Sequence, residues 1–496
     1  MRDRLTRRGL LAGGFGALLA GVAQPLWAEA PATSPFPRLR PGTAAAPGEE
    51  IARLIRAAKL GGQTGLILAD AQTGAVLEDF EADRPLPPAS TAKTITALYA
   101  LERLGANHRF VTRLLATGPL VNGQIAGDLI LAGGGDPTLD TDDLGDMAAA
   151  LRTAGVRSVS GRYLAYGGAL PELPRIAADQ PEQVGYNPGL SGLILNFGRV
   201  YFEWKKSGDG WAISMDARGE RFAPKIDLTR MEMAPREAPL FTYRLRETTE
   251  DWSVAQSALG KEGSRWLPVR RATPYVAEAF RALAAAQGIA LPRAEPLAAL
   301  PATARELARH ESEPLDAVLR GMLRWSTNIT AEAVGLAASG AGTLRGSARA
   351  MSDWAKRHLG HPGDFVDHSG LGAATRVTAR GMVQALQHAK TSASGHNLAA
   401  ILRDMGMRDA EGGAVENHPV RVRAKTGTLN FVSGLTGFIQ PPQGRELAFA
   451  IFSADPDRRA ALPMADRETP PGGEAWLKRA RKLQGQLLHR WGERYV

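Results

Sequence analysis

The sequence predicts an α+β fold in which two regions that combine helices with strands, residues 31–110 and 305–496, flank a mostly β region at residues 111–304. In the flanking regions apolar residues recur with helical spacing, whereas the middle region alternates short β-rich segments with glycine and proline. The chain has 496 residues, of which 44% are hydrophobic, enough for two or three folded domains. We expect the middle region to form one or two small domains.

The first thirty residues are a predicted targeting segment and do not enter the fold prediction. A basic start is followed by the apolar, glycine-rich stretch Gly9–Val22 and by Ala28-Glu29-Ala30, which fits an A-x-A cleavage site. The stretch Thr6-Arg7-Arg8-Gly9-Leu10-Leu11 resembles a twin-arginine export signal, and an ordinary secretory signal is the alternative. Both interpretations predict an exported, periplasmic protein. No later stretch approaches the roughly twenty apolar residues of a membrane span.

Composition excludes several classes of function. The formal net charge is +9, but the arginines are dispersed after the first eight residues, so we expect no nucleic-acid groove and at most peripheral contact with a membrane. The chain has 0 cysteines, which excludes disulfides and thiolate metal sites. The histidines lack metal-ligand spacing, so we predict no metal site and no cofactor. The histidines considered are His108, His310, His358, His361 and His368.

The N-terminal region predicts a helix, a hairpin and a second helix. Apolar positions between Glu49 and Leu60 have helical spacing, and the strand-like runs Gly65–Ala69 and Ala75–Phe80 follow, joined by a glycine-containing loop. After the loop, Pro87 and Pro88 suit the entrance of a helix whose apolar face runs from Ala92 to Leu104.

The start of this second helix carries a candidate nucleophile. Ser90 stands three positions before Lys93, so the two side chains share one helical face. A desolvated lysine can lose its proton and act as the base that a serine nucleophile needs, and the free N–H groups of the first helical turn can bind an oxyanion. By itself, Ser-x-x-Lys on a helix is more often a solvated polar pair.

The remaining elements are predicted from periodicity and turn residues. In the middle region strands are expected near 111–116, 128–132, 162–166, 198–204 and 212–216. After residue 304, helices are expected at 315–323, from 330, at 344–359, after a Thr378 cap and at the C-terminus, and strands at 422–428, 431–439 and 446–452. Asp367–Gly372 reads as a polar turn.

Two further motifs make the serine a strong candidate. Ser326-Thr327-Asn328 lies between two predicted helices, and Lys425-Thr426-Gly427 lies on a predicted strand. With Ser90-x-x-Lys93 they form, in this order and each once, the trio of the active-site serine penicillin-recognising enzymes, which this sequence resembles.

The long separation of the first two motifs resembles one family within that group. Residues 94–325 fill the interval, as in D-alanyl-D-alanine carboxypeptidase/endopeptidases of the penicillin-binding protein 4 type. Gly135–Leu139, Ser312-x-Pro314-Leu315 and Lys425–Leu429 add to the resemblance, while His368 stands where the family usually has glycine. The resemblance implies a β-lactamase/transpeptidase-like domain, an antiparallel sheet flanked by helices, at residues 31–110 and 305–496, interrupted by the insertion at 111–304.

The resemblance implies acyl transfer through a serine ester. Ser90 attacks the carbonyl between two D-alanines, or that of a diaminopimelate–D-alanine cross-link, while Lys93 takes its proton. Ser326 relays a proton to the leaving amine, and Asn328 holds Lys93 and the substrate amide. Lys425 supplies a fixed positive charge near the substrate carboxylate.

The resemblance also implies how substrate is held. Thr426 and Thr428 bind the carboxylate, the N–H groups of Ser90 and Thr428 form the oxyanion hole, and Gly427 leaves room for the substrate to add as an edge strand. Asp179 and Glu182 are candidates for contact with the amine of diaminopimelate. The expected partners are peptidoglycan peptides and β-lactams, which stall at the acyl-enzyme. The oligomeric state is left open.

Two other functions stay open at this point. A serine β-lactamase would turn over a chromogenic cephalosporin steadily through a glutamate-activated water, a residue that the insertion does not reveal. A non-catalytic peptidoglycan-binding protein would form no penicillin adduct on Ser90. Neither the sequence nor the resemblance decides between carboxypeptidase and endopeptidase preference.

Overall fold

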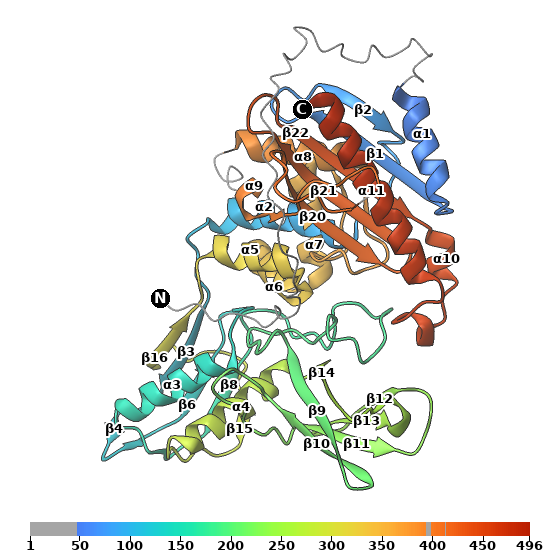
Figure 1. The fold of residues 1–496 in the computed structure, drawn as a ribbon. Coiled ribbons are helices and arrows are strands. Elements are labelled where there is room, and N and C mark those ends of the chain that lie inside the picture. Colours follow the sequence, from blue (N-terminus) through green and yellow to red (C-terminus); the bar gives the residue numbers. More distant parts are fainter. Residues whose placement is uncertain (1–46, 393–397, 412) are drawn as a thin grey trace, which may run out of the picture. The chain divides into compact units, whose positions relative to one another are not determined.

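The computed structural model describes residues 47–392, 398–411 and 413–496 (Figure 1). The predicted targeting segment and nearly all of the lead-in after it lie outside these residues. By their backbone contacts residues 46–496 form one unit, so the boundaries of the predicted regions remain a prediction. Among the described residues, no helix combines the length and the apolar character that crossing a membrane requires.

A six-stranded antiparallel sheet is the frame on which the motifs are placed. Its strand order is β19-β20-β21-β22-β1-β2. The strands are β1 (Gln63–Asp70), β2 (Val76–Phe80), β19 (Arg403–Asp404), β20 (Arg421–Leu429), β21 (Val432–Gln440) and β22 (Leu447–Ala454). The predicted N-terminal hairpin and the three predicted C-terminal strands are confirmed, and they meet where β22 pairs with β1.

Helices cover both faces of this sheet, which explains why its strands are almost continuously apolar. Successive side chains of a strand point to opposite faces, so Phe449 packs in one core and Ala450 in the other. On one face lie α1 (Pro47–Ala58) and α11 (Gly473–Tyr495), as Figure 1 shows for the long red helix. The other core includes α2 (Ala92–Leu104), α5 (Leu315–Trp325), α6 (Asn328–Ser339), α7 (Leu344–His358), α8 (Ala379–Thr391) and α9 (Leu398–Ile401).

The middle of the chain forms small sheets around a separate core. A five-stranded sheet has the order β15-β8-β6-β3-β16, and the other sheets have the orders β10-β9-β14, β11-β13-β12 and β4-β5-β7. The strands are β3 (Val111–Ala116), β4 (Leu120–Val121), β5 (Gln124–Ile125), β6 (Leu129–Ala132), β7 (Ser158–Val159), β8 (Tyr163–Tyr166), β9 (Arg199–Ser207), β10 (Gly210–Asp216), β11 (Thr229–Ala234), β12 (Phe241–Leu245), β13 (Glu250–Ala255), β14 (Glu262–Pro268), β15 (Ala294–Pro296) and β16 (Arg305–Glu311). All five predicted strand segments are confirmed, while β16 joins this region from just beyond residue 304.

Two helices in this region are not in the sequence prediction. They are α3 (Thr141–Thr153) and α4 (Ala272–Ala286), which pack on the same core. The start of α3 is capped by Asp140, whose carboxylate accepts the N–H groups of Asp142 and Asp143 at 2.8 and 2.9 Å. The region is therefore β-rich with two helices rather than β alone. The smaller elements in the described residues outside this region are β17 (Gly363–Asp364), β18 (Arg376–Val377), α10 (Pro456–Ala460) and two short 3₁₀ turns.

A buried carboxylate ties the C-terminal helix to the sheet. Glu78 on β2 is 5% exposed and accepts hydrogen bonds from Trp491 Nε1 at 2.9 Å and Tyr495 Oη at 2.7 Å. The Arg490 guanidinium completes the set as a close ion pair. Because all these partners lie on α11, this one side chain fixes the helix across the sheet.

We predict that Glu78→Ala lowers the free energy of unfolding by about 3 kcal/mol, because it removes the acceptor of the Trp491 and Tyr495 donors and leaves Arg490 with Glu50 as its remaining ion-pair partner. Chemical denaturation monitored by fluorescence measures the change. The exposed Glu493, also an acid but on the outer side of α11, is the control, and Glu493→Ala should change stability by less than about 0.5 kcal/mol. Equal effects of the two substitutions would contradict the prediction.

Candidate active site

Ser90 sits in a tight turn that packs against two glycines. The 3₁₀ turn η1 (Ala89–Thr91) precedes α2, and Ala89 has a positive φ of 48°. A Cβ atom on Gly427 would lie 2.4 Å from Pro88 O, and one on Gly370 would lie 1.9 Å from Ala89 O. The serine turn is thus held between β20 and the turn that contains Gly370, at a spacing that only glycine permits.

Lys93 is buried one turn beyond Ser90 and contacts it directly. Its side chain is 0% exposed, and Nζ lies 2.9 Å from Ser90 Oγ, 2.7 Å from Asn328 Oδ1 and 2.9 Å from Ser369 O. Burial lowers the pKa of Lys93 to about 7, against the opposing influence of Glu332 and Asp367. A lysine in this setting exchanges its proton near neutral pH.

The second motif is carried by the junction of α5 and α6. Ser326 ends α5 in a left-handed conformation with φ 61°, and Asn328 begins α6. Asn328 uses both ends of its amide, because Oδ1 accepts from Lys93 and Nδ2 donates to Tyr186 O at 2.9 Å. The SxN segment therefore contacts both the first motif and the middle region of the chain.

The third motif approaches from β20. Lys425 Nζ donates to Ser326 Oγ at 2.9 Å and to Thr426 O at 2.7 Å. Burial lowers the pKa of Lys425 well below its ordinary value, and the nearby Lys93 lowers it further. This direction opposes the fixed positive charge that the resemblance implies for Lys425, because a buried ammonium needs an anionic partner.

The edge of β20 beside the serine is open along the motif. β19 pairs only with Arg423 and Ala424, so among the described residues no strand pairs with this edge from Lys425 to Leu429. On its other edge β20 pairs along its whole length with β21. Thr426 and Thr428 are exposed on this strand. An extended peptide can therefore add to the sheet next to Ser90.

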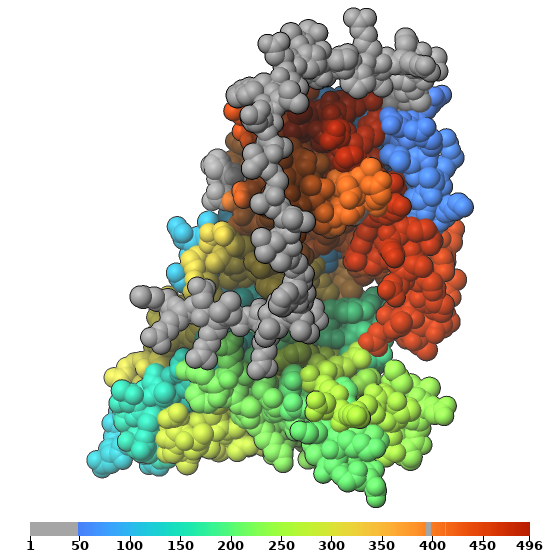
Figure 2. All heavy atoms as spheres, in the orientation of Figure 1, coloured from blue at the N-terminus to red at the C-terminus, as the bar shows by residue number. Residues whose placement is uncertain are grey.

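Residues of the first two motifs line one cleft of about 830 Å³, together with Thr428, which directly follows the third motif. Ser90, Ser326, Asn328 and Thr428 contribute to its wall, as do Gln180 and Tyr186 of the middle region and the C-terminal segment 467–477. In Figure 2 this red C-terminal segment reaches the green middle region, and Gln183 Nε2 donates to Glu468 Oε2 at 2.6 Å across the junction. The cleft is thus bounded by segments far apart in the sequence.

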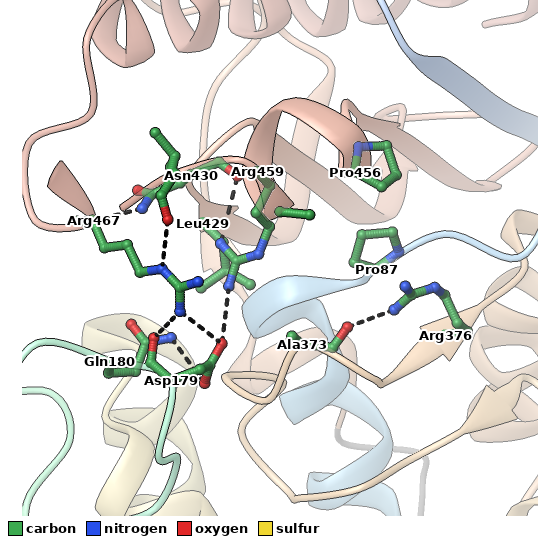
Figure 3. Close-up of a pocket in the computed structure, with 12 residues that line it drawn as sticks. Pro87, Asp179, Gln180, Ala373, Arg376, Leu429, Asn430, Pro456, Arg459 and Arg467 are labelled. Atoms are coloured by element: carbon green, nitrogen blue, oxygen red, sulfur yellow. Dashed lines mark hydrogen bonds and ion pairs between the residues drawn. The ribbon is translucent and has the colours of Figure 1, made fainter. Parts of the chain in front are cut away.

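The two predicted contacts for diaminopimelate are placed differently. Asp179 lines a smaller pocket of about 150 Å³, where its carboxylate lies 4.0 Å from Arg459 and 3.8 Å from Arg467. Figure 3 shows both guanidinium groups directed at Asp179, with Arg376 on another part of the lining and bonded to Ala373 O. Gln180 lines both this pocket and the cleft, so the two are neighbours.

Glu182 does not line either cavity. Its carboxylate pairs with Arg175 at 2.6 Å and with Arg270 at 3.2 Å, and the Arg270 side chain is 1% exposed. These contacts hold the loop that carries Asp179 and Tyr186 onto the middle region. A structural role accounts for this carboxylate.

Sequence reasoning missed one buried acid beside the site. Glu332 on α6 is 0% exposed, and its two oxygens accept the N–H groups of His368 and Ser369 at 2.9 Å each. Burial raises the pKa of Glu332 to about 8. A signal was present in the sequence, because this glutamate is the one charged residue in the otherwise apolar stretch 331–338.

The departure at His368 has a local explanation. The imidazole is 0% exposed, bonds Ser347 Oγ at 2.6 Å, and has its pKa lowered to about 3 by burial, so it is neutral. It occupies the space beside Gly335, where a Cβ would lie 2.2 Å from the ring. In the described residues no three acids or histidines are arranged to hold a metal ion.

Comparisons with known proteins agree with this geometry. The sequence model of the D-Ala-D-Ala carboxypeptidase 3 (S13) family matches residues 48–468. A D-alanyl-D-alanine carboxypeptidase of Actinomadura sp. (strain R39) is 29% identical over 437 residues, which cover 82% of this chain and 80% of that protein.

The fold resembles the crystal structure of penicillin-binding protein 4 from Haemophilus influenzae, with a TM-score of 0.72 and 21% identity over 88% of this chain and 99% of that chain. The same protein complexed with a β-lactam gives a TM-score of 0.69 and 22% identity, with equal coverage. The predicted α+β fold and family are confirmed. The chain belongs to the D-Ala-D-Ala carboxypeptidase 3 (S13) family and is a serine D-Ala-D-Ala carboxypeptidase of the penicillin-binding protein 4 type.

Proposed function

We propose that Ser90 is the nucleophile of this carboxypeptidase and that Lys93 is its base. The observation that supports this assignment is the 2.9 Å contact between Ser90 Oγ and the Nζ atom of a fully buried lysine. Because the pKa of Lys93 is about 7, a large fraction of the amine is uncharged at neutral pH and can accept the hydroxyl proton.

In the proposed reaction Ser90 Oγ attacks the carbonyl of the penultimate D-alanine and its proton passes to Lys93. The N–H groups of Ser90 and Thr428 bind the oxyanion. The tetrahedral intermediate then expels the amine of the last D-alanine, which takes the hydroxyl proton of Ser326. Ser326 is restored by a proton from Lys425, to which it is already hydrogen-bonded. Water then hydrolyses the ester: its hydroxyl group joins the acyl carbon and its proton returns to Ser90 Oγ. Lys93 releases to solvent the proton it took, and Lys425 regains one from solvent, so each group ends in its starting state.

The substrate carboxylate is assigned to Lys425, Thr426 and Thr428. The two threonines are exposed on the open edge of β20, and Lys425 lies beside Ser326. A bound carboxylate supplies the anionic partner that a buried ammonium requires, so it raises the pKa of Lys425 and charges it. Gly427, packed against Pro88 O, lets the substrate backbone lie close to the strand.

We propose two extensions of this activity. Replacing the last D-alanine by the amine-linked diaminopimelate of a neighbouring stem leaves the acyl half of the reaction unchanged, so cross-linked peptides are substrates as well. β-Lactams acylate Ser90 and are released slowly, because their leaving amine stays tethered to the acyl group. We also propose that residues 1–30 direct export to the periplasm, where these substrates occur.

Asp179 is proposed to bind the side-chain amine of diaminopimelate. It lines the pocket next to the cleft. Arg467 donates to its backbone oxygen at 2.5 Å, but its carboxylate lies 3.8 and 4.0 Å from Arg467 and Arg459, which leaves the carboxylate room for another cation. The carboxylate carried by the same side chain would face Arg376, Arg459 and Arg467. A zwitterionic side chain thus matches the charges around this pocket.

Penicillin labelling tests the nucleophile. We expect mass spectrometry to find one covalent adduct on the Ser90 peptide of the wild-type protein, and Ser90→Ala to lose the adduct together with at least about 10⁴-fold of peptidase activity. A retained adduct, or steady turnover of a chromogenic cephalosporin in place of a lasting adduct, would contradict the proposal. Ser392→Ala, remote from the three motifs in sequence, should label normally.

The pH dependence of acylation tests the base. Only uncharged Lys93 accepts a proton, so kcat/KM should fall about tenfold for each pH unit below about 7 and level off above it. Stopped-flow measurement of the acylation rate with a reporter β-lactam, at about ten pH values between pH 5 and 9, gives the profile. The exposed Lys478 is the matched control, since Lys478→Met should leave the profile unchanged. A flat profile through pH 7 would remove Lys93 as the base.

Substrate analogues test Asp179. Asp179→Asn should raise KM about tenfold for a peptide with a free diaminopimelate amine and leave KM unchanged for the N-acetylated peptide, since only the former carries the cation. Glu182→Gln is the matched control, and it should affect both peptides equally. If Asp179→Asn also affects both equally, the carboxylate does not bind the amine.

A further inference from the structure

One buried acid beside the cleft has no part in the proposed mechanism. Glu332 does not line the cleft, and it makes no direct hydrogen bond to Lys93 or Ser90. An acid that is 0% exposed is costly to bury, and a neutral polar side chain could accept a hydrogen bond at a smaller cost. Its position therefore needs a reason beyond packing.

Glu332 is connected to the base through a single residue. Its Oε1 accepts Ser369 N–H at 2.9 Å, and Ser369 O in turn accepts a hydrogen bond from Lys93 Nζ at 2.9 Å. The second oxygen, Oε2, accepts His368 N–H at 2.9 Å. The glutamate thus fixes the peptide segment whose carbonyl contacts the catalytic amine.

The turn around Ser369 is also held by residues other than Glu332. The hydrogen bonds that Glu332 accepts are therefore not needed merely to stabilise the turn. Asp367 accepts the N–H groups of Gly370 and Gly372 at 2.8 and 2.5 Å. The neutral His368 ring is held by Ser347 of α7, and Thr96 of α2 donates to His368 O at 2.6 Å. Glu332 alone joins the turn to α6 through two backbone N–H groups.

The charges around the amine come from four elements. α2 carries Lys93 itself, α6 carries Glu332, the turn carries Asp367, and β20 carries Lys425. Asp179 adds a weaker negative influence on Asp367. Burial disfavours each isolated charge, so ionised Lys93 is best tolerated together with an ionised acid. With only one anion left near it, the Lys93 ammonium would be less stable.

We propose that Glu332 is a positioning residue for acylation: it holds Ser369 O against Lys93, and it shares one proton with the amine, so that its ionised form stabilises the protonated amine. This inference rests on the proposed function, in which Lys93 is the base. Glu332 would thereby keep the base from becoming so weak that it no longer takes the serine proton. It acts through Ser369 and does not touch the substrate.

Two variants of Glu332 distinguish the effect of its charge from the effect of its side-chain length. Glu332→Gln removes the charge, so the acid limb of the acylation profile should move at least about half a pH unit lower, with a lower plateau rate. Glu332→Asp keeps the charge but shortens the side chain, so the limb should stay in place while the plateau falls about tenfold, because one of the two N–H contacts is lost. Both are measured with a reporter β-lactam.

Ser347→Ala is the structural control, because it removes the hydrogen bond to His368 without changing any charge near Lys93. It should lower the melting temperature and leave the limb unmoved. The inference is overturned if the acid limb of the pH–rate profile does not move in Glu332→Gln. It is also overturned if Glu332→Asp keeps the wild-type plateau rate, and this second measurement decides the question if Glu332→Gln does not fold. If the wild-type protein forms no adduct on Ser90, or shows no limb near pH 7, the proposed function itself fails.

Discussion

The buried amine of Lys93, whose pKa burial lowers to about 7, is the constraint on which the rest of the site depends. A lysine in water is protonated at neutral pH and cannot take a proton from serine, so burial has to remove that charge. Complete burial requires that the helix carrying Lys93 be surrounded by the rest of the protein. Helix α2 meets this requirement, because its residues from Ala92 to Leu101 are buried. Among the described residues, Lys93 Nζ donates to three acceptors, Ser90 Oγ, Asn328 Oδ1 and Ser369 O. Packing of α2 and chemistry at Ser90 are therefore consequences of one placement.

Close backbone contacts supply the precision that this placement needs. The serine turn lies between Gly370 and Gly427, so β20 and the Asp367–Gly372 turn approach it more closely than any residue with a Cβ allows. The approach from β20 brings Lys425 to Ser326, and the approach from the turn brings Ser369 O to Lys93. Two glycines from distant segments thus set distances that side chains alone could not fix.

The sequence could predict those parts of the fold and of the site that depend on local patterns of residues. The hairpin, the C-terminal strands and the Thr378 cap follow from periodicity and turn residues, and the cap is confirmed by the 3.0 Å bond from Gly381 N–H. Helix α4 was missed because its many alanines give a weak pattern inside a β-rich region. Helix α3 was missed although its Asp140 cap and the aspartates of its first turn are a helix-start signal. The apolar stretch around Glu332 indicated its burial, but its partners are backbone N–H groups nearly forty residues away, and no local pattern encodes those contacts.

The site contains two buried lysines, Lys93 and Lys425, and the protonation of one disfavours the protonation of the other. Each lowers the other's tendency to be protonated, and Lys93 is named among the causes of the lowered pKa of Lys425. Before substrate binds, the acids Glu332 and Asp367 favour a proton on Lys93, whereas Lys425 has no such partner. In the proposed mechanism a substrate carboxylate beside Thr426 and Thr428 gives Lys425 its anion, and a charged Lys425 then disfavours the proton on Lys93. In the proposed mechanism the substrate's own carboxylate therefore helps to free the base, so a peptide lacking that carboxylate loses more than a binding contact.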